Sequence, residues 1–350
     1  MSLPLSQPFF PMEAKSAAKI PIGPEWQYEP KWDGFRCIVF RDSDSVVLQS
    51  KAGKPLTRYF PEIVEAMGKV KAKQFVLDGE LIVPRDGQLS FDDLLQRIHP
   101  AASRVAKLAA ETPAQLVVFD LLVDAKGTSV AEENLSVRRN ALEAFYRKFL
   151  VDNDRVLLSR ATPDLPAARK WLNELRGQLD GIIAKRVDRP YESGERAMQK
   201  IKNIRTADCV VGGFRYGTDS KEVGSLLLGL YHKGVLDHVG FTSSIAAASR
   251  ASLTKKLETL IEPPGFTGAA PGGPSRWSTD RSTEWQPLKP VLVAEVQFDH
   301  FTGGRFRHGT KFMRWRPDKD PKQCTVKQVQ SDAAVPLGLL TVAANHAKPP

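Results

Sequence analysis

The stretch EPKWDGFR, residues 29–36, places Lys31 between a proline and a tryptophan and follows it with Asp33 and Gly34. A lysine in this setting is either a solvated charge at the end of a strand or a nucleophile. A lone Lys-x-Asp-Gly pattern arises by chance in about one chain in twenty of this length, so it decides nothing by itself. The choice between the two interpretations depends on the rest of the chain.

The composition predicts a basic, globular protein. The chain has 350 residues, which is enough for two ordinary domains, and 42% of them are hydrophobic. It has no apolar run long enough to span a membrane and no signal peptide pattern, so a cytoplasmic location is expected. The three cysteines are far apart and odd in number, which excludes a disulfide framework and a four-cysteine zinc site. The net charge of +10 favours a polyanionic partner such as nucleic acid without proving it.

The first part of the chain predicts a mixed α+β domain. Residues 35–40 and 45–50 flank the polar turn RDSD, which indicates a β-hairpin. Residues 90–98 begin with a serine cap and carry apolar residues at helical spacing. Residues 136–150 predict an amphipathic helix with its basic residues on the solvent-facing side. Further strands are expected at residues 75–83, 115–123, 181–187 and 197–203.

The composition changes near residue 208, where short strands begin to alternate with glycine turns. A helix is expected within residues 243–261, and a Pro/Gly/Ser-rich loop at 262–287 precedes the last strands. This pattern predicts a small barrel such as an OB-fold. The expected organisation is therefore an irregular lead-in at 1–24, a first domain at 25–205, an OB-fold domain at 206–332 and a disordered tail at 333–350.

Charged residues recur in the predicted strands. LDGEL (77–81) places Glu80 in an apolar strand, and VFDLL (118–122) places Phe119 beside an acid. DGIIAKR (180–186) carries Asp180 at its start and Lys185 near its end. Because side chains alternate along a strand, Lys200 and Lys202 should share one face. RWRPDKD (314–320) ends the second predicted domain.

With the flanks SFDDLLQR and FDLL, these stretches in this order resemble the covalent nucleotidyltransferase superfamily of DNA ligases, RNA ligases and mRNA capping enzymes. They are most similar to the bacterial ATP-dependent DNA ligases, and the length resembles that of the small two-domain actinobacterial ligase C type. The resemblance covers roughly residues 20–325. It implies an α+β nucleotidyltransferase domain of antiparallel sheets with ATP between them, followed by an all-β OB-fold domain. It also implies that 5′-phosphate/3′-hydroxyl nicks are sealed through lysine-AMP and DNA-adenylate, with a role in DNA repair.

The resemblance implies a role for each matching residue. Lys31 is the nucleophile, and Asp33 shapes its loop and assists the sealing step. Asp180, where the family usually has Glu, would hold the metal together with Glu80. Contacts to the nucleotide are implied for Glu29 at adenine, Arg36 and Glu80 at the ribose, Phe119 by stacking, and Lys185, Lys200 and Lys202 at the phosphates. The other interpretation of Phe119 is an ordinary core residue.

The resemblance extends to the end of the second predicted domain. Arg316, Asp318 and Lys319 are implied to move onto the triphosphate and orient pyrophosphate during self-adenylation. The implied cofactors are ATP, as the AMP donor, and Mg²⁺ or Mn²⁺. The implied partners are nicked double-stranded DNA and a repair polymerase, and a monomer without membrane contact is expected.

DNA contacts are predicted at two places. Residues 302–316 contain five arginines and lysines, no acid, and several aromatic residues, which is typical of a surface for the nucleic-acid backbone. The candidates there are Arg305, Arg307 and Lys311, and the alternative is a solvated pair of strands. Lys51 is the other candidate, although the family more often has Arg at that position. A second departure is Met198, which stands where the family usually has Trp.

The implied chemistry sets a requirement on Lys31. Its amine must attack the α-phosphorus of ATP, but a free lysine has a pKa of about 10.4 and is protonated at neutral pH. Nearby cations lower such a pKa. Lys185, Lys200, Lys202 and a bound magnesium ion are the candidates, and they would also neutralise the departing pyrophosphate.

Three other functions stay open at this point. A capping guanylyltransferase uses a similar lysine with GTP, and an RNA ligase shares the first domain. A non-enzymatic, basic OB-type nucleic-acid-binding protein explains the charge but leaves Glu80 and Asp180 without a role. Transfer of a nucleotide onto Lys31 would separate the enzymes from the binding protein.

Overall fold

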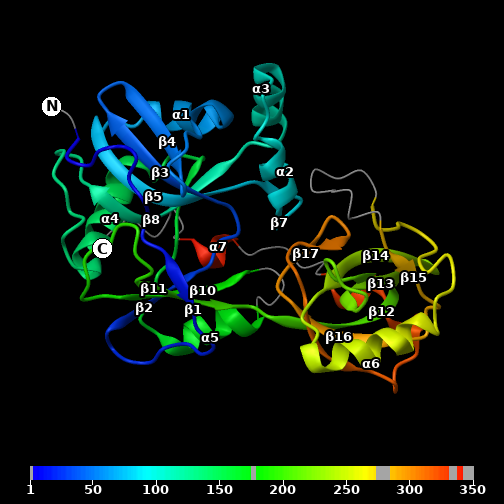
Figure 1. Ribbon diagram of the computed structural model, residues 1–350. Coiled ribbons are helices and arrows are strands. Elements are labelled where there is room, and N and C mark those ends of the chain that lie inside the picture. Colours follow the sequence, from blue (N-terminus) through cyan, green and yellow to red (C-terminus); the bar gives the residue numbers. More distant parts are fainter. Residues whose placement is uncertain (1–2, 175–178, 273–283, 331–336, 342–350) are drawn as a thin grey trace. The chain divides into compact units, whose positions relative to one another are not determined.

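The chain forms two compact units in the computed structural model (Figure 1). The structure describes residues 3–174, 179–272, 284–330 and 337–341. The first unit comprises residues 1–203 and 333–350, and the second comprises residues 204–332. Among the described residues, no helix has both the length and the apolar character needed to cross a membrane.

Two sheets make up the first unit. The larger has the strand order β4-β3-β5-β8-β9, and the smaller has the order β1-β11-β10-β2. Most pairings are antiparallel, as predicted, but β1 with β11 and β8 with β9 are parallel. The larger sheet contains β3 (Phe35–Asp42), β4 (Ser45–Ser50), β5 (Gln74–Ile82), β8 (Gln115–Val123) and β9 (Val156–Leu158). The smaller contains β1 (Ala14–Ser16), β2 (Trp26–Pro30), β10 (Gly181–Arg186) and β11 (Met198–Lys202). A separate hairpin pairs β6 (Pro84–Arg85) with β7 (Gln88–Leu89).

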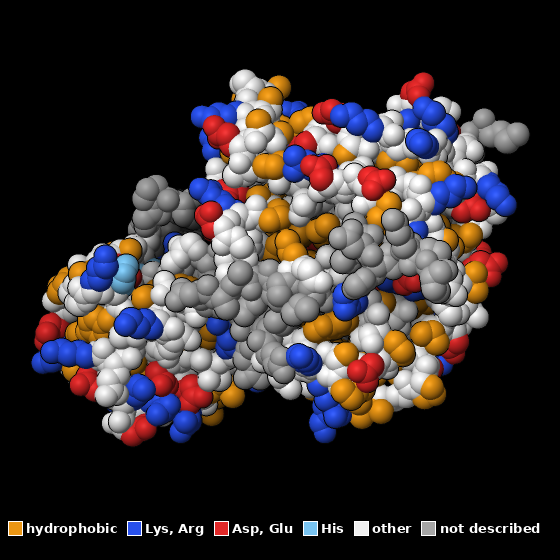
Figure 2. Space-filling model, turned by 180° about the vertical axis from the view of Figure 1, so that it is seen from behind, with side chains coloured by type: hydrophobic (Ala, Val, Ile, Leu, Met, Phe, Trp, Pro, Cys, Tyr) orange, Lys and Arg blue, Asp and Glu red, His pale blue; other side chains and the backbone are white. Residues whose placement is uncertain are grey.

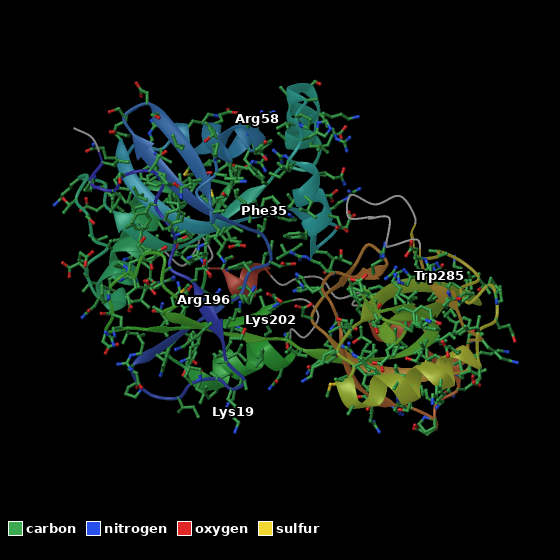
Figure 3. All side chains as sticks on the ribbon, in the orientation of Figure 1. Lys19, Phe35, Arg58, Arg196, Lys202 and Trp285 are labelled. Atoms are coloured by element: carbon green, nitrogen blue, oxygen red, sulfur yellow. The ribbon has the colours of Figure 1, made fainter. Side chains whose placement is uncertain are left out.

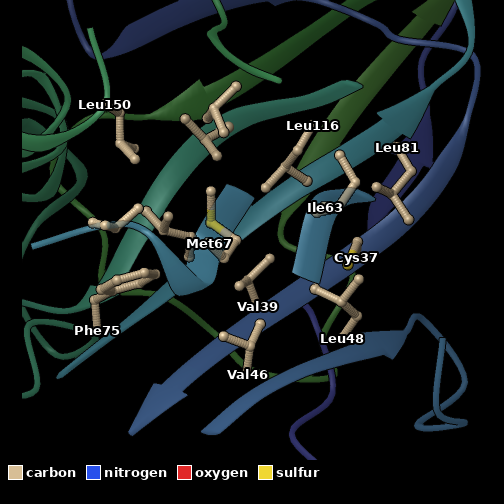
Figure 4. Packing of buried hydrophobic residues seen from close by; sticks show 14 of the residues in the cluster. Cys37, Val39, Val46, Leu48, Ile63, Met67, Phe75, Leu81, Leu116 and Leu150 are labelled. Carbon is tan, nitrogen blue, oxygen red and sulfur yellow. The ribbon is translucent and has the colours of Figure 1, made fainter. Parts of the chain in front are cut away.

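The larger sheet is buried on both faces because its strands carry apolar residues at odd and even positions alike. Along β3, Cys37 and Val39 pack into one cluster, shown in Figure 4, while Ile38 and Phe40 pack into another. The predicted hairpin of β3 and β4 is confirmed by their antiparallel register. Near-continuous apolar strands of this kind are typical of a sheet covered on both sides.

α1 (Pro61–Gly68) packs against β4 and α4 (Leu135–Phe149) against β8 of the larger sheet, while α5 (Leu165–Glu174) packs on the smaller sheet. α2 begins where predicted, because the Ser90 hydroxyl accepts a hydrogen bond from the backbone N–H of Asp93 at 3.2 Å. The helices of this unit are α1 (Pro61–Gly68), α2 (Phe91–Gln96), α3 (Ala102–Glu111), α4 (Leu135–Phe149), α5 (Leu165–Glu174) and α7 (Leu337–Leu340), with a 3₁₀ turn at Thr57–Tyr59.

The basic residues of α4 do not all face solvent, so that prediction was wrong. Arg138 is fully buried, and its guanidinium donates to both carboxylate oxygens of Asp120 at 2.9 and 3.1 Å. Arg139 is also buried and donates to the carbonyl of Ser159. The physical reason is that Asp120 lies inside the buried strand β8, where a carboxylate needs a cationic partner.

The described residues at both ends of the chain include regular secondary structure that was not predicted. The segment expected to be irregular at 1–24 contains β1, which pairs with β11. Within the tail expected to be disordered at 333–350, residues 337–341 form α7 and a bridge from Thr341 to Ser159. Leu340 is buried in the same cluster as Tyr28 and Trp32, so apolar burial orders this piece. The rest of the tail lies outside the described residues.

The second unit is a curled antiparallel sheet with the order β14-β13-β12-β16-β19, in which β15 also pairs with β12. Its apolar core takes residues from the strands of this sheet and from the helix α6 (Ala247–Glu258). Its strands are β12 (Arg205–Tyr216), β13 (Val223–His232), β14 (Val235–Thr242), β15 (Gln286–Pro287), β16 (Val293–Phe298), β17 (Phe301–Thr302), β18 (Arg305–Phe306) and β19 (Lys311–Trp315). Two 3₁₀ turns come after them at Pro321–Gln323 and Val326–Gln328. Residues 273–283 of the predicted loop at 262–287 lie outside the described residues.

The net positive charge is not gathered on the face drawn in Figure 2, where basic and acidic side chains intermingle. Total charge is therefore a poor guide to a binding surface on that face, and local groups of side chains have to be considered instead.

Candidate active site

A pocket of about 210 Å³ lies between the two sheets of the first unit. Strands of both sheets and the loops next to them contribute its walls. It brings together most of the predicted nucleotide contacts, which come from segments far apart in the sequence. Its lining includes Glu29, Lys31, Arg36, Lys51, Glu80, Phe119, Lys185 and Lys200.

Strand pairing places Lys31 beside Asp180. β2 and β10 are antiparallel, and the Lys31 backbone N–H donates to the Gly181 carbonyl at 2.9 Å. A glycine is required at 181 because its φ is +143° and an added Cβ would lie 2.1 Å from the Ile201 carbonyl oxygen. The end of β2 and the start of β10 therefore meet closely, and the Lys31 ammonium forms an ion pair with the Asp180 carboxylate.

The pKa of Lys31 is raised, which differs from the expectation of a lowered one. Burial lowers this pKa, but the charge and hydrogen bond of Asp180 and the charges of Glu80 and Asp33 outweigh burial. Before any ligand adds positive charge, the carboxylates around the amine dominate over the cations. The cations do gather nearby, since the pKa of Lys200 is lowered by burial and by Lys31 and Lys202.

Glu80 is a carboxyl group whose pKa lies near neutrality. Burial raises the pKa to about 7, against the opposing charges of Arg36 and Lys31. The loop after Lys31 packs onto β5 so tightly that a Cβ on Gly34 would lie 2.0 Å from the Leu81 carbonyl oxygen. This close approach brings the Lys31 loop next to Glu80, so the Lys31 ammonium and this acid act in one electrostatic environment.

Arg36 is held by residues that the sequence did not single out. Its guanidinium donates to both oxygens of Asp78 at 2.6 Å and to the Met12 carbonyl at 3.2 Å. The Tyr191 hydroxyl donates to the same carboxylate at 2.6 Å and accepts from the Met12 backbone N–H at 3.0 Å. The signal for Asp78 was an acid in an apolar strand, but its partner Tyr191 is distant in sequence and gave none.

Phe119 forms an apolar wall between two cations. The ring is buried, and the Arg36 Cζ and Lys185 Nζ lie 4.6 and 4.7 Å from its centroid. Lys185 also pairs with the buried carboxylate of Glu29 at 2.8 Å. Glu29 in turn accepts from the Gln27 side-chain amide at 2.9 Å. These residues form one connected group on the wall of the pocket.

The N-terminal segment supplies another wall, which sequence reasoning missed. Residues 11–14 line the pocket. The segment is fixed by the loop before β11, because Glu13 N–H donates to the Glu195 carbonyl at 2.7 Å and Met198 N–H donates to the Glu13 carbonyl at 3.1 Å. Met198 itself lines the pocket, at the position where the resembling family usually has Trp. This short segment, Pro-Met-Glu-Ala in a proline-rich stretch without periodicity, gave no sequence signal for this role.

The carboxylates at the site suit a magnesium ion that is shared with phosphates. Asp180 contacts the Lys31 ammonium, and Glu80 lines the same pocket as Lys31. No group of three or more His, Cys, Asp or Glu in the described part of the chain could hold a metal by itself. Mg²⁺ usually takes one or two carboxylates and completes its shell with water and substrate phosphates. Asp180 and Glu80 fit that donor set.

The remaining predicted residues are divided between the two units. Lys202 ends β11, and Asp33 is in the Lys31 loop. Arg316 belongs to the second unit, where its guanidinium bonds to Asp318 at 2.9 Å and to Asp208 at 3.0 Å. Lys319 lies 3.6 Å from the same Asp208. The predicted DNA contacts Arg305, Arg307 and Lys311 are also in the second unit, on or beside β18 and β19.

Comparison with known proteins decides the family. Residues 11–202 match the model of the ATP dependent DNA ligase domain, and residues 219–319 match the model of the ATP dependent DNA ligase C terminal region. The chain belongs to the ATP-dependent DNA ligases. It is 44% identical to DNA ligase C1 of Mycolicibacterium smegmatis over 95% of this chain and 96% of that protein. It is 42% identical to DNA ligase C of Mycobacterium tuberculosis over 96% of this chain and 98% of that protein.

A solved structure of a Lig E DNA ligase agrees in fold, with a TM-score of 0.52, 18% identity, and coverage of 88% of this chain and 99% of that one. The predicted α+β nucleotidyltransferase domain with an OB-fold domain is therefore confirmed for this ligase. The resemblance to small bacterial ATP-dependent DNA ligases, and the assignment as an enzyme of that class, are confirmed as well. Membership of this family disfavours the capping enzyme, the RNA ligase and the non-enzymatic binding protein.

Proposed function

We propose that this ligase seals nicked double-stranded DNA through an AMP group carried on Lys31. The observation that carries the proposal is the position of the Lys31 amine in the pocket between the sheets, in contact with Asp180 and beside Glu80. In self-adenylation a bond forms between Lys31 Nζ and the α-phosphorus of ATP, and the bond from that phosphorus to pyrophosphate breaks. AMP then moves to the 5′-phosphate at the nick, and the 3′-hydroxyl displaces AMP.

The contacts around Lys31 define what must change before attack. The ammonium carries the proton that Asp180 helps to retain, and the free amine is the attacking form. Cations that enter beside the Asp180 carboxylate would weaken its hold on the ammonium and lower the pKa of Lys31. Lys185 and Lys200, which line the same pocket, would meet the phosphates.

The nucleotide would occupy the pocket with its base toward Phe119 and Glu29. Phe119 offers an apolar ring, and Glu29 offers carboxylate oxygens that can accept from an amino group of a base. Arg36, held by Asp78, and Glu80 would reach the ribose hydroxyls. Asp180 and Glu80 would hold Mg²⁺ or Mn²⁺. When bound, that ion neutralises triphosphate charge and favours departure of pyrophosphate.

We propose that the second unit supplies two further functions. Arg316, Asp318 and Lys319 would assist pyrophosphate release, since Arg316 and Lys319 are cations of the OB-fold domain that can meet the charge of a phosphate. Arg305, Arg307 and Lys311 would contact the DNA backbone. The chain would act in the cytoplasm as a monomer in DNA repair, next to a repair polymerase.

A test of the proposal measures covalent labelling. The protein and magnesium are incubated with α-labelled ATP or α-labelled GTP, and the labelled peptide is identified by mass spectrometry. The expected result is one AMP on Lys31, from ATP and not GTP. Lys31→Ala should abolish the label, while Lys19→Ala, which removes an exposed lysine of the same unit (Figure 3), should retain it. A label on another lysine, or one taken from GTP, would overturn the proposal.

A further inference from the structure

A short segment near the C-terminus belongs to the first unit. Residues 337–341 follow the whole second unit in sequence, yet they group with residues 1–203 by their contacts. Figure 1 draws α7, in red, among the elements of the first unit. Leu340 is fully buried and Thr341 is 5% exposed, so the segment is part of the core of this unit.

The segment covers the end of an edge strand. β9 is the edge strand of the larger sheet, and Ser159 follows it directly. Ser159 forms an antiparallel bridge with Thr341, and the backbone N–H of Arg160 donates to the Leu340 carbonyl at 2.9 Å. The Arg160 guanidinium also donates to the Thr341 carbonyl at 3.3 Å. The segment therefore satisfies backbone groups that the end of an edge strand would otherwise leave open.

Ser159 connects this segment to the Lys31 loop. The Trp32 indole N–H donates to the Ser159 hydroxyl at 2.9 Å, and both side chains are buried. Trp32 is the residue directly after Lys31. Ser159 is also held through its backbone, since its N–H donates to the Val118 carbonyl and its carbonyl accepts from the Arg139 guanidinium, each at 2.9 Å. A displacement of the backbone at Ser159 would therefore displace the hydrogen-bond acceptor of Trp32.

Leu340 completes the apolar cluster behind the pocket. The cluster that contains Leu340 also contains Trp32 and Phe119. Both of these residues line the pocket that holds Lys31. Because protein interiors are closely packed, loss of the Leu340 side chain would leave a cavity that its neighbours fill only in part by moving. Such a movement would reach the pocket wall at Trp32 and Phe119.

We propose that residues 337–341 position the Lys31 loop for self-adenylation, and that Leu340 is the positioning residue, acting through Ser159 and Trp32. The inference rests on the proposed transfer of AMP to Lys31. The alternative is a segment that only stabilises the fold. Positioning is favoured because the hydrogen bonds of the segment end at the residue that holds Trp32, next to the nucleophile.

The test follows self-adenylation of the full-length chain at saturating ATP and magnesium. Leu340→Ala should slow formation of the AMP–protein about threefold to tenfold per folded molecule, because a small misplacement of a reacting group lowers the rate. Leu340→Met, which nearly conserves volume, should restore the rate. Leu340→Val, which removes less volume than Leu340→Ala, should show a smaller change and serves where Leu340→Ala does not fold.

The same short helix offers a matched control. Gly338 is exposed, and an added Cβ there would meet no atom within 4 Å. Gly338→Ala should therefore leave the rate of self-adenylation unchanged. Equal effects of Gly338→Ala and Leu340→Ala would overturn the inference.

A second readout separates positioning from stability. The chain is labelled with fluorotryptophan, and the fluorine NMR resonance of Trp32 is identified as the signal missing from Trp32→Phe. Leu340→Ala should shift this resonance and leave that of Trp285, in the second unit, in place. A lower melting temperature with an unchanged rate and an unmoved Trp32 resonance would overturn the inference alone. A wild-type protein that takes no AMP would instead refute the proposed function, and with it any role in self-adenylation.

Discussion

The ammonium of Lys31 forms an ion pair with the carboxylate of Asp180, and both groups are largely removed from solvent, with side chains 22% and 3% exposed. The ion pair stabilises the protonated form of Lys31, whose pKa is raised. In the proposed mechanism the amine is therefore held in its unreactive state before ATP binds, and cations that enter beside Asp180 would lower the pKa of Lys31 and activate the amine.

Asp180→Asn should lower the pKa of Lys31. Burial, which lowers that pKa, would remain, while the main opposing charge would be lost and the acceptor would become a neutral amide oxygen. The check is competitive acetylation of the ligand-free protein across a pH series, with each lysine followed by mass spectrometry. The midpoint for Lys31 should move to lower pH than in wild type, and Lys19 serves as the internal reference. An unchanged midpoint would show that Asp180 does not control the proton on Lys31.

Glu80→Gln should stabilise the ligand-free protein at alkaline pH. The Glu80 pKa is raised from its ordinary value of 4.5 to about 7, so the folded state binds a proton more tightly than the unfolded chain. The cost of ionising Glu80 therefore builds up as the pH rises from about 4.5 to about 7, and stays on the order of 1–3 kcal/mol above that.

The measurement is the free energy of unfolding by urea at pH 5 and pH 8. The advantage of Glu80→Gln over wild type should be larger at pH 8. Glu132→Gln, at an exposed position, should show no such difference between the two pH values. An advantage for Glu80→Gln that is equal at both pH values would contradict the raised pKa.

Asp78→Asn should destabilise the first unit by about 3 kcal/mol, because it leaves the Arg36 guanidinium without its two charged contacts and weakens the bond from Tyr191. Tyr191→Phe should cost about 1 kcal/mol, since it removes single hydrogen bonds to Asp78 and Met12. The free energy of unfolding of each variant is measured by chemical denaturation. If the larger cost belonged to Tyr191→Phe, the charged contact would not be the main support of Arg36.

Arg138→Ala should cost about 3–5 kcal/mol, because Asp120 would remain as an unpaired charge in the core. Arg147→Ala on the same helix should change the free energy of unfolding by less than about 0.5 kcal/mol. Thermal and urea unfolding of the two variants give the comparison. If both substitutions changed the free energy of unfolding equally little, the ion pair of Arg138 with Asp120 would not stabilise the fold.

Local patterns allowed much of the fold to be predicted. The hairpin of β3 and β4 is explained by apolar runs around a polar turn, and the start of α2 is explained by Ser90. The resemblance supplied the residues of the pocket. The predictions that failed depended on contacts far apart in sequence. The pairing of Arg138 with Asp120 contradicted an ordinary amphipathic pattern, and the pocket wall at residues 11–14 depends on a loop near residue 195.

The sequence motifs that pointed to Lys31 could not predict that its pKa is raised. The sequence contained both the cations and the carboxylates around this lysine, but only distances decide which dominate. Asp180 is in direct contact, whereas Lys200 and Lys202 act from β11. The balance of charge at a site is thus a property of the fold rather than of its sequence motifs.

The central claim is that AMP on Lys31 is an intermediate in DNA sealing. The most direct measurement isolates the labelled AMP–protein, removes free ATP, and mixes it with excess nicked duplex and magnesium for a single turnover. We predict that the label leaves Lys31 and appears first on the DNA 5′-phosphate and then as free AMP, with sealed DNA equal to the label lost. Label that stays on the protein, or sealing that proceeds equally with Lys31→Ala, would contradict the claim.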